Sequence, residues 1–242
     1  MRRFPYHLAL TALALSLGVG VAQAQLYNVP VFFSPAFGTG VGVFGDFGMG
    51  LNDDAKFGAD APLAFGGHVI VGLSKFQIMG GATYVDTKTT TFDKELSFGG
   101  NIALTLFRTP ASMVVVNVQA GAGYAKFGTG ADEYKELNFP IGVGLALNPP
   151  LVGAIVEPWI APRAHIFRQT LAGTSQTEVG FGVSGGVNAS LLLGIGAWAA
   201  VDWLTIKPEG ATESLTPFVL GAGLSWKFSV PSLGIPGGII GG

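Results

Sequence analysis

The chain has 242 residues and no cysteine, which excludes a disulfide framework and lipid attachment at a cysteine. Hydrophobic residues make up 49% and charged residues only 12%, about half the usual share. Even so, no apolar run after the first 25 residues reaches the length of about 18 that a transmembrane helix needs.

The first 24 residues have the organisation of a secretory signal peptide. Arg2 and Arg3 form a positive start, residues 8–22 are apolar, and Ala22-Gln23-Ala24 provides small residues for cleavage. A transmembrane anchor fits less well, because the apolar run is short and the small-residue site follows it directly. Losing Arg2 and Arg3 leaves 11 basic against 15 acidic residues, a net charge of −4. This balance gives no support to nucleic-acid binding.

Residues 25–35 are apolar and contain Pro30 and Pro35, so we expect an irregular N-terminal lead-in rather than a strand. Large and small residues then alternate with a period of two, as residues 96–107 show most clearly. One face of that segment carries Leu96, Phe98, Ile102, Leu104 and Leu106, and the other carries Ser97, Gly99, Asn101, Ala103 and Thr105. Such alternation predicts a strand with one apolar face.

About ten segments of this kind lie between residues 36 and 228. They are residues 40–51, 65–74, 76–86, 96–107, 113–125, 137–147, 154–167, 179–189, 193–205 and 215–228. The face that points outward is ambiguous only for residues 76–86. Long connections, such as 52–64 and 168–178, alternate with short ones, such as 74–75 and 190–191. This layout predicts long extracellular loops, short periplasmic turns and both termini in the periplasm.

The pattern predicts an all-β fold, a transmembrane up-and-down antiparallel β-barrel of about ten strands spanning residues 36–228. Eight strands is the second choice, if residues 76–86 or 193–205 are misassigned. A soluble barrel of the lipocalin type is the rival, but it needs large apolar residues inside. Here the second face of the strands carries mostly Gly, Ser, Asn, Ala and Thr, which are too small to fill such a core.

Residues 218–228, Phe-Val-Leu-Gly-Ala-Gly-Leu-Ser-Trp-Lys-Phe, resemble the closing strand of bacterial outer-membrane β-barrels. The resemblance implies a location in the outer membrane of a Gram-negative bacterium, contact with its lipids, and recognition by the barrel-assembly machinery. Trp226 and Phe228 would form the assembly signal. In the family the Phe usually ends the chain, whereas here a Gly- and Pro-rich C-terminal tail, residues 229–242, follows. We expect this tail to be a periplasmic end or a partial plug of the barrel mouth.

Few ionisable residues interrupt the strands, and their phase turns them inward, because a lipid-facing charge near the midplane costs about 2–4 kcal/mol. We predict a polar network in the lumen formed by Asp46, His68, Glu157, Arg163, His165, Asp202 and Lys227. It would be either a structural salt-bridge network or a polar pathway with a ligand site. Among the tryptophans, Trp159 and Trp198 have the inward phase, and Trp203 and Trp226 the outward phase.

We expect a non-enzymatic envelope protein that is structural or forms a narrow passage for small or hydrophobic molecules or ions. The alternative is a surface adhesin or binding protein that acts through its extracellular loops. A barrel-embedded hydrolase ranks third: His68, His165 and Asp202 would lie toward the extracellular end, but no G-x-S-x-G motif accompanies them. We predict no catalytic residue, metal site or cofactor.

Overall fold

The computed structural model describes residues 26–56, 60–89, 95–110, 113–129, 133–149, 154–171, 173–191, 193–208 and 211–228. The expected signal peptide, residues 1–24, and the C-terminal tail, residues 229–242, lie outside the described residues. No helix in the described part of the chain is both long and apolar enough to cross a membrane.

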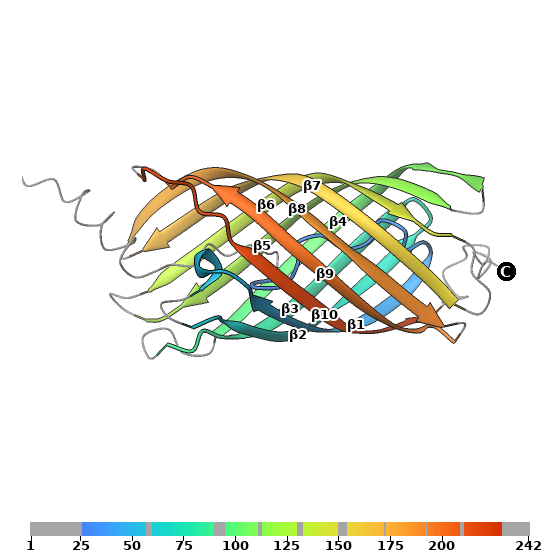
Figure 1. The fold of residues 1–242 in the computed structure, drawn as a ribbon, viewed down its shortest axis with the longest axis horizontal. Helices are drawn as coiled ribbons and strands as arrows, with labels where there is room; N and C mark the ends of the chain where they lie inside the picture. The colour runs from blue at the N-terminus through green and yellow to red at the C-terminus, as the bar shows by residue number, and fades with distance from the viewer. Residues whose placement is uncertain are drawn as a thin grey trace, which may run out of the picture.

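Ten antiparallel strands in the described residues form a closed barrel (Figure 1). Each strand pairs with its neighbour in the sequence, and β10 pairs with β1 to close the ring. The strands are β1 (Gly40–Gly50), β2 (Leu63–Leu73), β3 (Phe76–Asp86), β4 (Glu95–Arg108), β5 (Val114–Phe127), β6 (Tyr134–Leu147), β7 (Ala154–Leu171), β8 (Thr174–Leu191), β9 (Ile195–Ile206) and β10 (Phe218–Phe228). The predicted all-β barrel of ten strands is confirmed.

The outer surface of the barrel carries the large apolar side chains. Ile102 of β4 and Phe181 of β8 are each 61% exposed, and the same alternation continues around the ring. In β3, whose orientation the sequence left ambiguous, Phe76, Ile78 and Tyr84 point outward. Because the sheet is closed, each strand has a hydrogen-bonded neighbour on both edges, and its outer surface is apolar. A hydrocarbon environment requires both properties.

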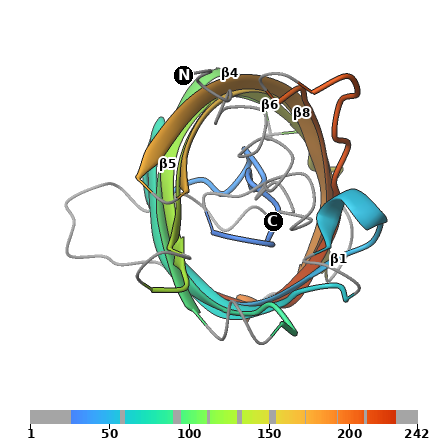
Figure 2. The ribbon, with the colours of Figure 1, turned by 90° about the vertical axis from the view of Figure 1, so that its left-hand side faces the viewer.

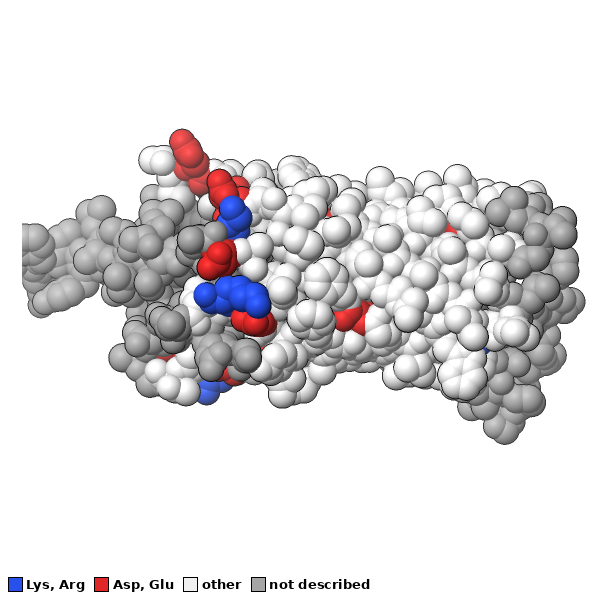
Figure 3. All heavy atoms as spheres, turned by 60° about the horizontal axis from the view of Figure 1, so that its bottom comes forward, with Lys and Arg blue, Asp and Glu red and all other residues white. Residues whose placement is uncertain are grey.

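Charged residues gather at one end of the barrel in the face shown in Figure 3. This is the long-loop end, where the connections spanning residues 51–62, 87–94 and 207–217 lie. The opposite, short-turn end contains the tight turn at residues 74–75 and the connections 109–113 and 192–194. The predicted alternation of long and short connections therefore holds for most of the chain.

The connection between β7 and β8 is different from the prediction. Residues 168–178 were expected to form a long loop, but β7 continues to Leu171 and β8 begins at Thr174. Their pairing extends through Arg168 opposite Thr177 and Leu171 opposite Thr174. The hairpin was missed because its outer part is polar on both faces and has no apolar alternation to mark a strand.

Residues 26–39, here called the N-terminal segment, lie inside the barrel, as the view along its axis shows (Figure 2). The Tyr27 ring packs 4.8 Å from the Phe127 ring, at the end of β5 that lies at the long-loop end. At the other end of the segment, the Ser74 N–H donates to Thr39 Oγ1 at 3.2 Å, in the short-turn region. The segment therefore runs the length of the lumen before β1 begins.

This course places the start of the described chain at the end of the barrel opposite to the start of β1. β1 begins and β10 ends at the short-turn end, as predicted for an even number of strands. The described chain, however, starts with Leu26 at the long-loop end, next to Tyr27. The lead-in was expected to be irregular, and the N-terminal segment contains turns and extended chain but no assigned strand.

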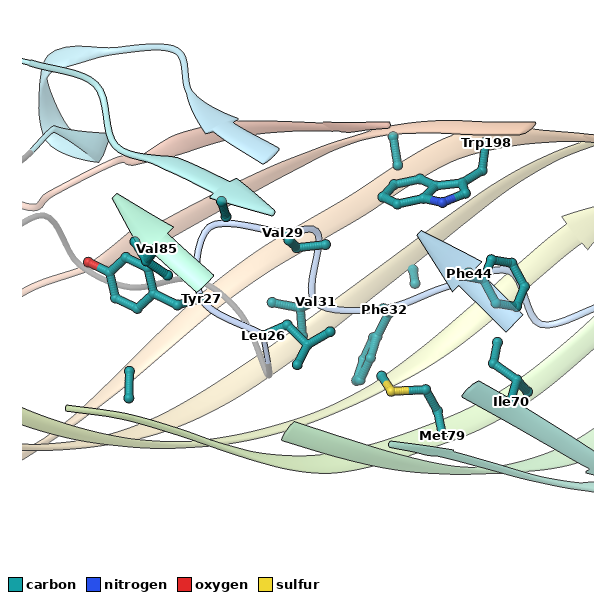
Figure 4. Close-up of a cluster of buried hydrophobic side chains, with 14 of the residues drawn as sticks. Leu26, Tyr27, Val29, Val31, Phe32, Phe44, Ile70, Met79, Val85 and Trp198 are labelled. Atoms are coloured by element: carbon teal, nitrogen blue, oxygen red, sulfur yellow. The ribbon is translucent and has the colours of Figure 1, made fainter. Parts of the chain in front are cut away.

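The lumen wall has no side chain where the N-terminal segment comes closest. A Cβ atom on Gly48 of β1 would lie 1.9 Å from the carbonyl oxygen of Asn28. A Cβ atom on Gly221 of β10 would lie 2.3 Å from Cδ of Pro30. Figure 4 shows Leu26, Val29, Val31 and Phe32 packed between the strands of the barrel. These four side chains are at most 1% exposed, so the segment forms the middle of the hydrophobic core.

A clamp at the long-loop end joins the first and last connections across the junction of β1 and β10. The β1–β2 connection contains a short 3-10 helix, η1 (Asp53–Ala55). Asn52 just before it donates to the Thr216 carbonyl at 2.7 Å and accepts the Phe218 N–H at 2.9 Å. Asp54 Oδ2 accepts the Thr216 N–H at 2.8 Å and its hydroxyl at 3.0 Å.

Candidate functional site

Arg163 is the centre of a buried polar group on β7, β8 and β9. Its guanidinium forms an ion pair with Asp202, donates to the Ser184 hydroxyl at 2.9 Å, and donates through Nε to His165 Nε2. The Ser184 hydroxyl in turn donates to Asp202 Oδ2 at 2.6 Å. Space for the guanidinium comes from Gly182, opposite Arg163, where a Cβ would lie 3.0 Å from Nη2.

The protonation of His165 follows from its two partners. Because Arg163 Nε donates to Nε2, that ring nitrogen acts as an acceptor. The other nitrogen, Nδ1, is 2.9 Å from Asn138 Oδ1 and carries the proton. His165 is thus a neutral spacer between Arg163 and Asn138, and the full positive charge of the group is on Arg163.

Asp46 and His68 form a second, separate pair on β1 and β2. His68 Nδ1 is 2.6 Å from Asp46 Oδ2, and both side chains are completely buried. The imidazole lies between two phenylalanine rings, stacked on Phe44 at 4.3 Å and tilted against Phe33 at 4.1 Å between centroids. Asp46 Oδ1 and His68 Nε2 have no hydrogen-bond partner in the described structure.

Glu157 and Lys227 belong neither to the Arg163 group nor to the Asp46–His68 pair. Glu157 Oε1 accepts the Ser34 hydroxyl and the Asn188 amide, the latter at 3.2 Å. The Lys227 ammonium lies 5.3 Å from the centre of the Phe37 ring, a cation–π contact at the short-turn end.

The seven predicted lumen residues therefore fall into four groups, all of which touch the N-terminal segment. Asp202 Oδ2 accepts the Val31 N–H at 2.9 Å. The Phe33 ring packs against His68. The Ser34 hydroxyl donates to Glu157, and the Phe37 ring forms the cation–π contact with Lys227. The segment is the common partner that the sequence analysis did not identify.

The wall also contains uncharged polar residues that were not predicted from the sequence. Gln77 Nε2 donates to the Pro35 carbonyl at 3.0 Å, and Gln119 Nε2 donates to the Phe33 carbonyl at 3.2 Å. Asn101 donates to Gln119 Oε1 at 3.2 Å and thereby orients its amide. Their inward phase is visible in the sequence, so the available signal was a polar amide on the small-residue face of a strand.

A cavity of about 10 Å³ lies beside these contacts, between the wall and the N-terminal segment. Its lining includes Phe33, Ser34, Gln77, Asn101 and Gln119. That volume accommodates about one water molecule. The described residues contain no group of three or more His, Cys, Asp or Glu side chains arranged to hold a metal ion.

The tryptophans divide between the two surfaces as their phase predicted. Trp159 and Trp198 are buried in the lumen, whereas Trp203 and Trp226 are exposed on the outside. The residues of the expected assembly signal, Trp226 and Phe228, lie side by side on the outer face of β10 with ring centres 5.4 Å apart.

A closed ten-strand ring with an apolar exterior and a lumen filled by its own N-terminal segment defines the class of this protein as a transmembrane-type β-barrel. Its fold is similar to those of solved outer-membrane barrels. The β domain of the Bordetella autotransporter BrkA has a TM-score of 0.44 and 14% identity, over 78% of this chain and 99% of that one. The outer-membrane protease OmpT from Escherichia coli has a TM-score of 0.44 and 9% identity, over 82% and 99%. No protein-family model and no curated protein sequence matches the chain.

Proposed function

We propose that this protein is an integral outer-membrane β-barrel that forms a narrow passage for small molecules or ions, held closed by its N-terminal segment. One observation carries the proposal: the segment fills the lumen but is held there by apolar packing and by hydrogen bonds to side chains of the wall, not by a strand ladder. Asp202 and Gln77, for example, each hold one backbone group of the segment. Such contacts can be broken singly without opening the barrel.

The membrane location rests on the exterior of the barrel and on the N-terminal sequence. A belt of exposed Leu, Ile, Val and Phe side chains needs a hydrocarbon environment, because soluble proteins rarely expose a continuous apolar surface of this extent. The signal-peptide pattern of residues 1–24 provides for export. Outer-membrane lipids and the barrel-assembly machinery are the partners that this location implies.

We further propose that the protein is not an enzyme. His68 and His165 are buried and already bonded to Asp46, and to Arg163 and Asn138, respectively. The hydroxyl of Ser184 donates to Asp202 rather than to a histidine. These contacts support a role in filling and organising the lumen, since a catalytic nucleophile needs a general base and access to its substrate.

A disulfide lock tests the passage. The protein has no native cysteine, and Ser184 Oγ lies 3.4 Å from the backbone nitrogen of Phe32. In the mature chain carrying Phe32→Cys and Ser184→Cys, oxidation ties the segment to β8 and reduction frees it. We expect discrete conductance steps in planar bilayers for the reduced form and silence for the oxidised form.

Ser184→Cys alone is the matched control, since a single cysteine cannot form the disulfide lock. Its conductance should change neither on oxidation nor on reduction. Silence of the reduced, inserted double variant would reject the passage. Equal conductance of both redox forms would show that the N-terminal segment does not close it.

A second candidate is surface binding through the loops, as an adhesin or binding protein. The charge at the long-loop end favours it (Figure 3), with ion pairs such as Lys88–Asp86 at 2.7 Å and Lys126–Glu133 at 2.8 Å. Replacing residues 87–94 with a Gly-Ser linker of equal length tests this function. Unchanged attachment of whole cells to every ligand bound by the parent would count against it.

A further inference from the structure

The lumen wall recognises the main chain of the N-terminal segment. The Val31 N–H donates to Asp202 at 2.9 Å and the Phe32 N–H donates to Ser184 at 3.4 Å. From the opposite wall, Gln119 donates to the Phe33 carbonyl at 3.2 Å and Gln77 donates to the Pro35 carbonyl at 3.0 Å. Four strands, β9, β8, β5 and β3, thus each contribute one side chain that binds a backbone group of residues 31–35.

We propose that the lumen is a binding site for an extended polypeptide, of which residues 31–35 are the built-in and exchangeable ligand. The inference rests on the proposed function in one respect: the segment that closes the passage is also the ligand of this site. Backbone groups are common to all peptides, so the four wall side chains define a class of ligand, an extended chain, rather than one sequence.

Side-chain contacts select among such peptides. The Phe33 ring meets the imidazole of His68 at 4.1 Å and the Trp198 ring edge-on at 5.7 Å. The next residue, Ser34, donates its hydroxyl to Glu157. The site therefore fits a peptide with an aromatic residue followed by a hydroxyl residue.

The shape of the wall provides independent support. Pro30 lies over Gly221 and the Asn28 carbonyl lies over Gly48, and in both places a Cβ would collide with the segment. On the outward side of β1, by contrast, a Cβ on Gly45 would have no atom within 4 Å. Close approach of the N-terminal segment thus requires glycine at positions 48 and 221, whereas position 45 has room for a side chain.

The binding energy is of a kind that permits exchange. Three of the four hydrogen bonds involve neutral side chains and contribute modestly, while the fourth is accepted by the Asp202 carboxylate. The covalent link to β1 keeps the segment at a high effective concentration near its site. A segment held in this way can leave once the link is cut. By contrast, a strand of the barrel wall is bound by a complete ladder on both edges and cannot leave singly.

The experiment cuts the link after folding. A protease recognition sequence is placed between Gly38 and Thr39, where Thr39 is exposed at the short-turn end. The full mature chain is folded in detergent, inserted into lipid discs and cleaved. A fluorescent synthetic peptide of residues 26–37 is then added, and its binding is followed by anisotropy together with release of the native fragment by mass spectrometry.

We expect saturable exchange of the labelled peptide for the native fragment. Methylating the backbone nitrogens of Val31 and Phe32 removes two donors and keeps both side chains, and should weaken binding about ten- to hundredfold. A peptide methylated only at the Phe33 nitrogen controls for bulk, because this nitrogen has no hydrogen bond within the described residues. It should bind within about threefold of the parent.

Wall variants test the same site without altering the peptide. Gln119→Leu removes the donor to the Phe33 carbonyl and should weaken peptide binding about tenfold. Thr105→Val is its matched control, because the Thr105 hydroxyl is buried with no partner in the described structure. Equal affinity of the doubly methylated and parent peptides, or no displacement of the fragment at any peptide concentration, would overturn the inference.

Binding and conductance separate this inference from the passage itself. A barrel that exchanges peptides but stays silent when emptied would retain the site and reject the passage. A barrel that conducts when emptied but does not rebind the peptide would retain the passage and reject the site.

Discussion

Pro30 lies directly over Gly221, so close that a Cβ atom on the glycine would approach Pro30 Cδ to 2.3 Å. This contact joins the N-terminal segment to the last strand of the barrel, across about 190 residues of sequence. It shows that the inner wall is shaped for its occupant at particular positions.

Gly221→Val should therefore displace the N-terminal segment. The added side chain overlaps Pro30 and cannot turn away from it on an inward-facing strand position, and overpacking of this kind costs about 1–3 kcal/mol. We expect a lower midpoint of thermal unfolding and more frequent conductance steps than in the parent. Gly45→Val is the control, since its side chain would point into open space outside the barrel. Identical behaviour of the two variants would contradict a close fit at Gly221.

Removing Arg163 should be among the most damaging single changes in the lumen. Arg163→Met leaves the Asp202 carboxylate buried without its ion-pair partner, at a cost of about 3–5 kcal/mol. The double variant Arg163→Met, Asp202→Leu removes both charges and should recover part of that loss. Urea unfolding of both variants in the same detergent measures the difference. A double variant less stable than Arg163→Met would show that Asp202 is stabilised chiefly by Ser184 and Val31.

The clamp across the junction of β1 and β10 should limit local opening at the long-loop end. Asp54→Ala removes the acceptor of the Thr216 N–H and hydroxyl, two partly buried hydrogen bonds worth about 1 kcal/mol each. Hydrogen exchange at the Thr216 amide should accelerate about tenfold or more. Asp53→Ala in the same 3-10 helix, which loses only an exposed pair with Lys56, should leave that rate unchanged. Equal exchange rates at the Thr216 amide in both variants would show that the Asp54 hydrogen bonds do not limit local opening.

Glu133 offers a test of pH dependence outside the strands. Hydrogen bonds and charge from Lys126, and then from Lys135, lower the pKa of Glu133 from 4.5 to about 2. Because the pKa is depressed in the folded protein, this interaction is fully present above about pH 4.5 and is lost as the pH falls toward 2. Carbon-13 NMR of the Glu133 carboxyl should follow this titration. Lys126→Gln and Lys135→Gln should each raise the midpoint, and an unchanged midpoint in both would contradict the assignment.

The outward position of Phe228 allows a test of the assembly signal. Phe228→Ala should reduce the fraction of the protein recovered as folded barrel from the outer membrane, if the assembly machinery reads this residue. Phe65→Ala is a matched control, because Phe65 is also an exposed outward phenylalanine, on β2. The heat-induced gel shift of the barrel measures the folded fraction. Equal loss in both variants would assign the effect to the membrane surface instead.

Which wall residues face outward and which face the lumen could be predicted from sequence, because the size and polarity of each side chain indicate its face of the strand. Ile102 and Asn101 are neighbours in the sequence, and period two alone places one outside and one inside. The partners inside could not be predicted, since Asp46 meets His68 and Arg163 meets Asp202 only through the stagger between strands.

The occupant of the lumen was missed for a different reason. Val29, Val31 and Phe32 have no periodicity, and an apolar lead-in with two prolines has no pattern to mark its neighbours. Gly48 and Gly221 are also uninformative alone, because glycine is common on the inner face of a narrow barrel. The structure shows why glycine is needed there, because the N-terminal segment packs directly against both positions.

The pairing of β1 with β10 has a consequence for the order of folding. It joins the two ends of the barrel and has the largest sequence separation of all the strand pairs, so its loop-closure entropy makes it a late event. Before it forms, the sheet is an open trough into which residues 26–39 can be laid sideways. Once it forms, the same residues can be inserted only by threading from an end. Side-on docking followed by closure is therefore the shorter folding route. Pairing of β10 with β1 then encloses the N-terminal segment in the lumen.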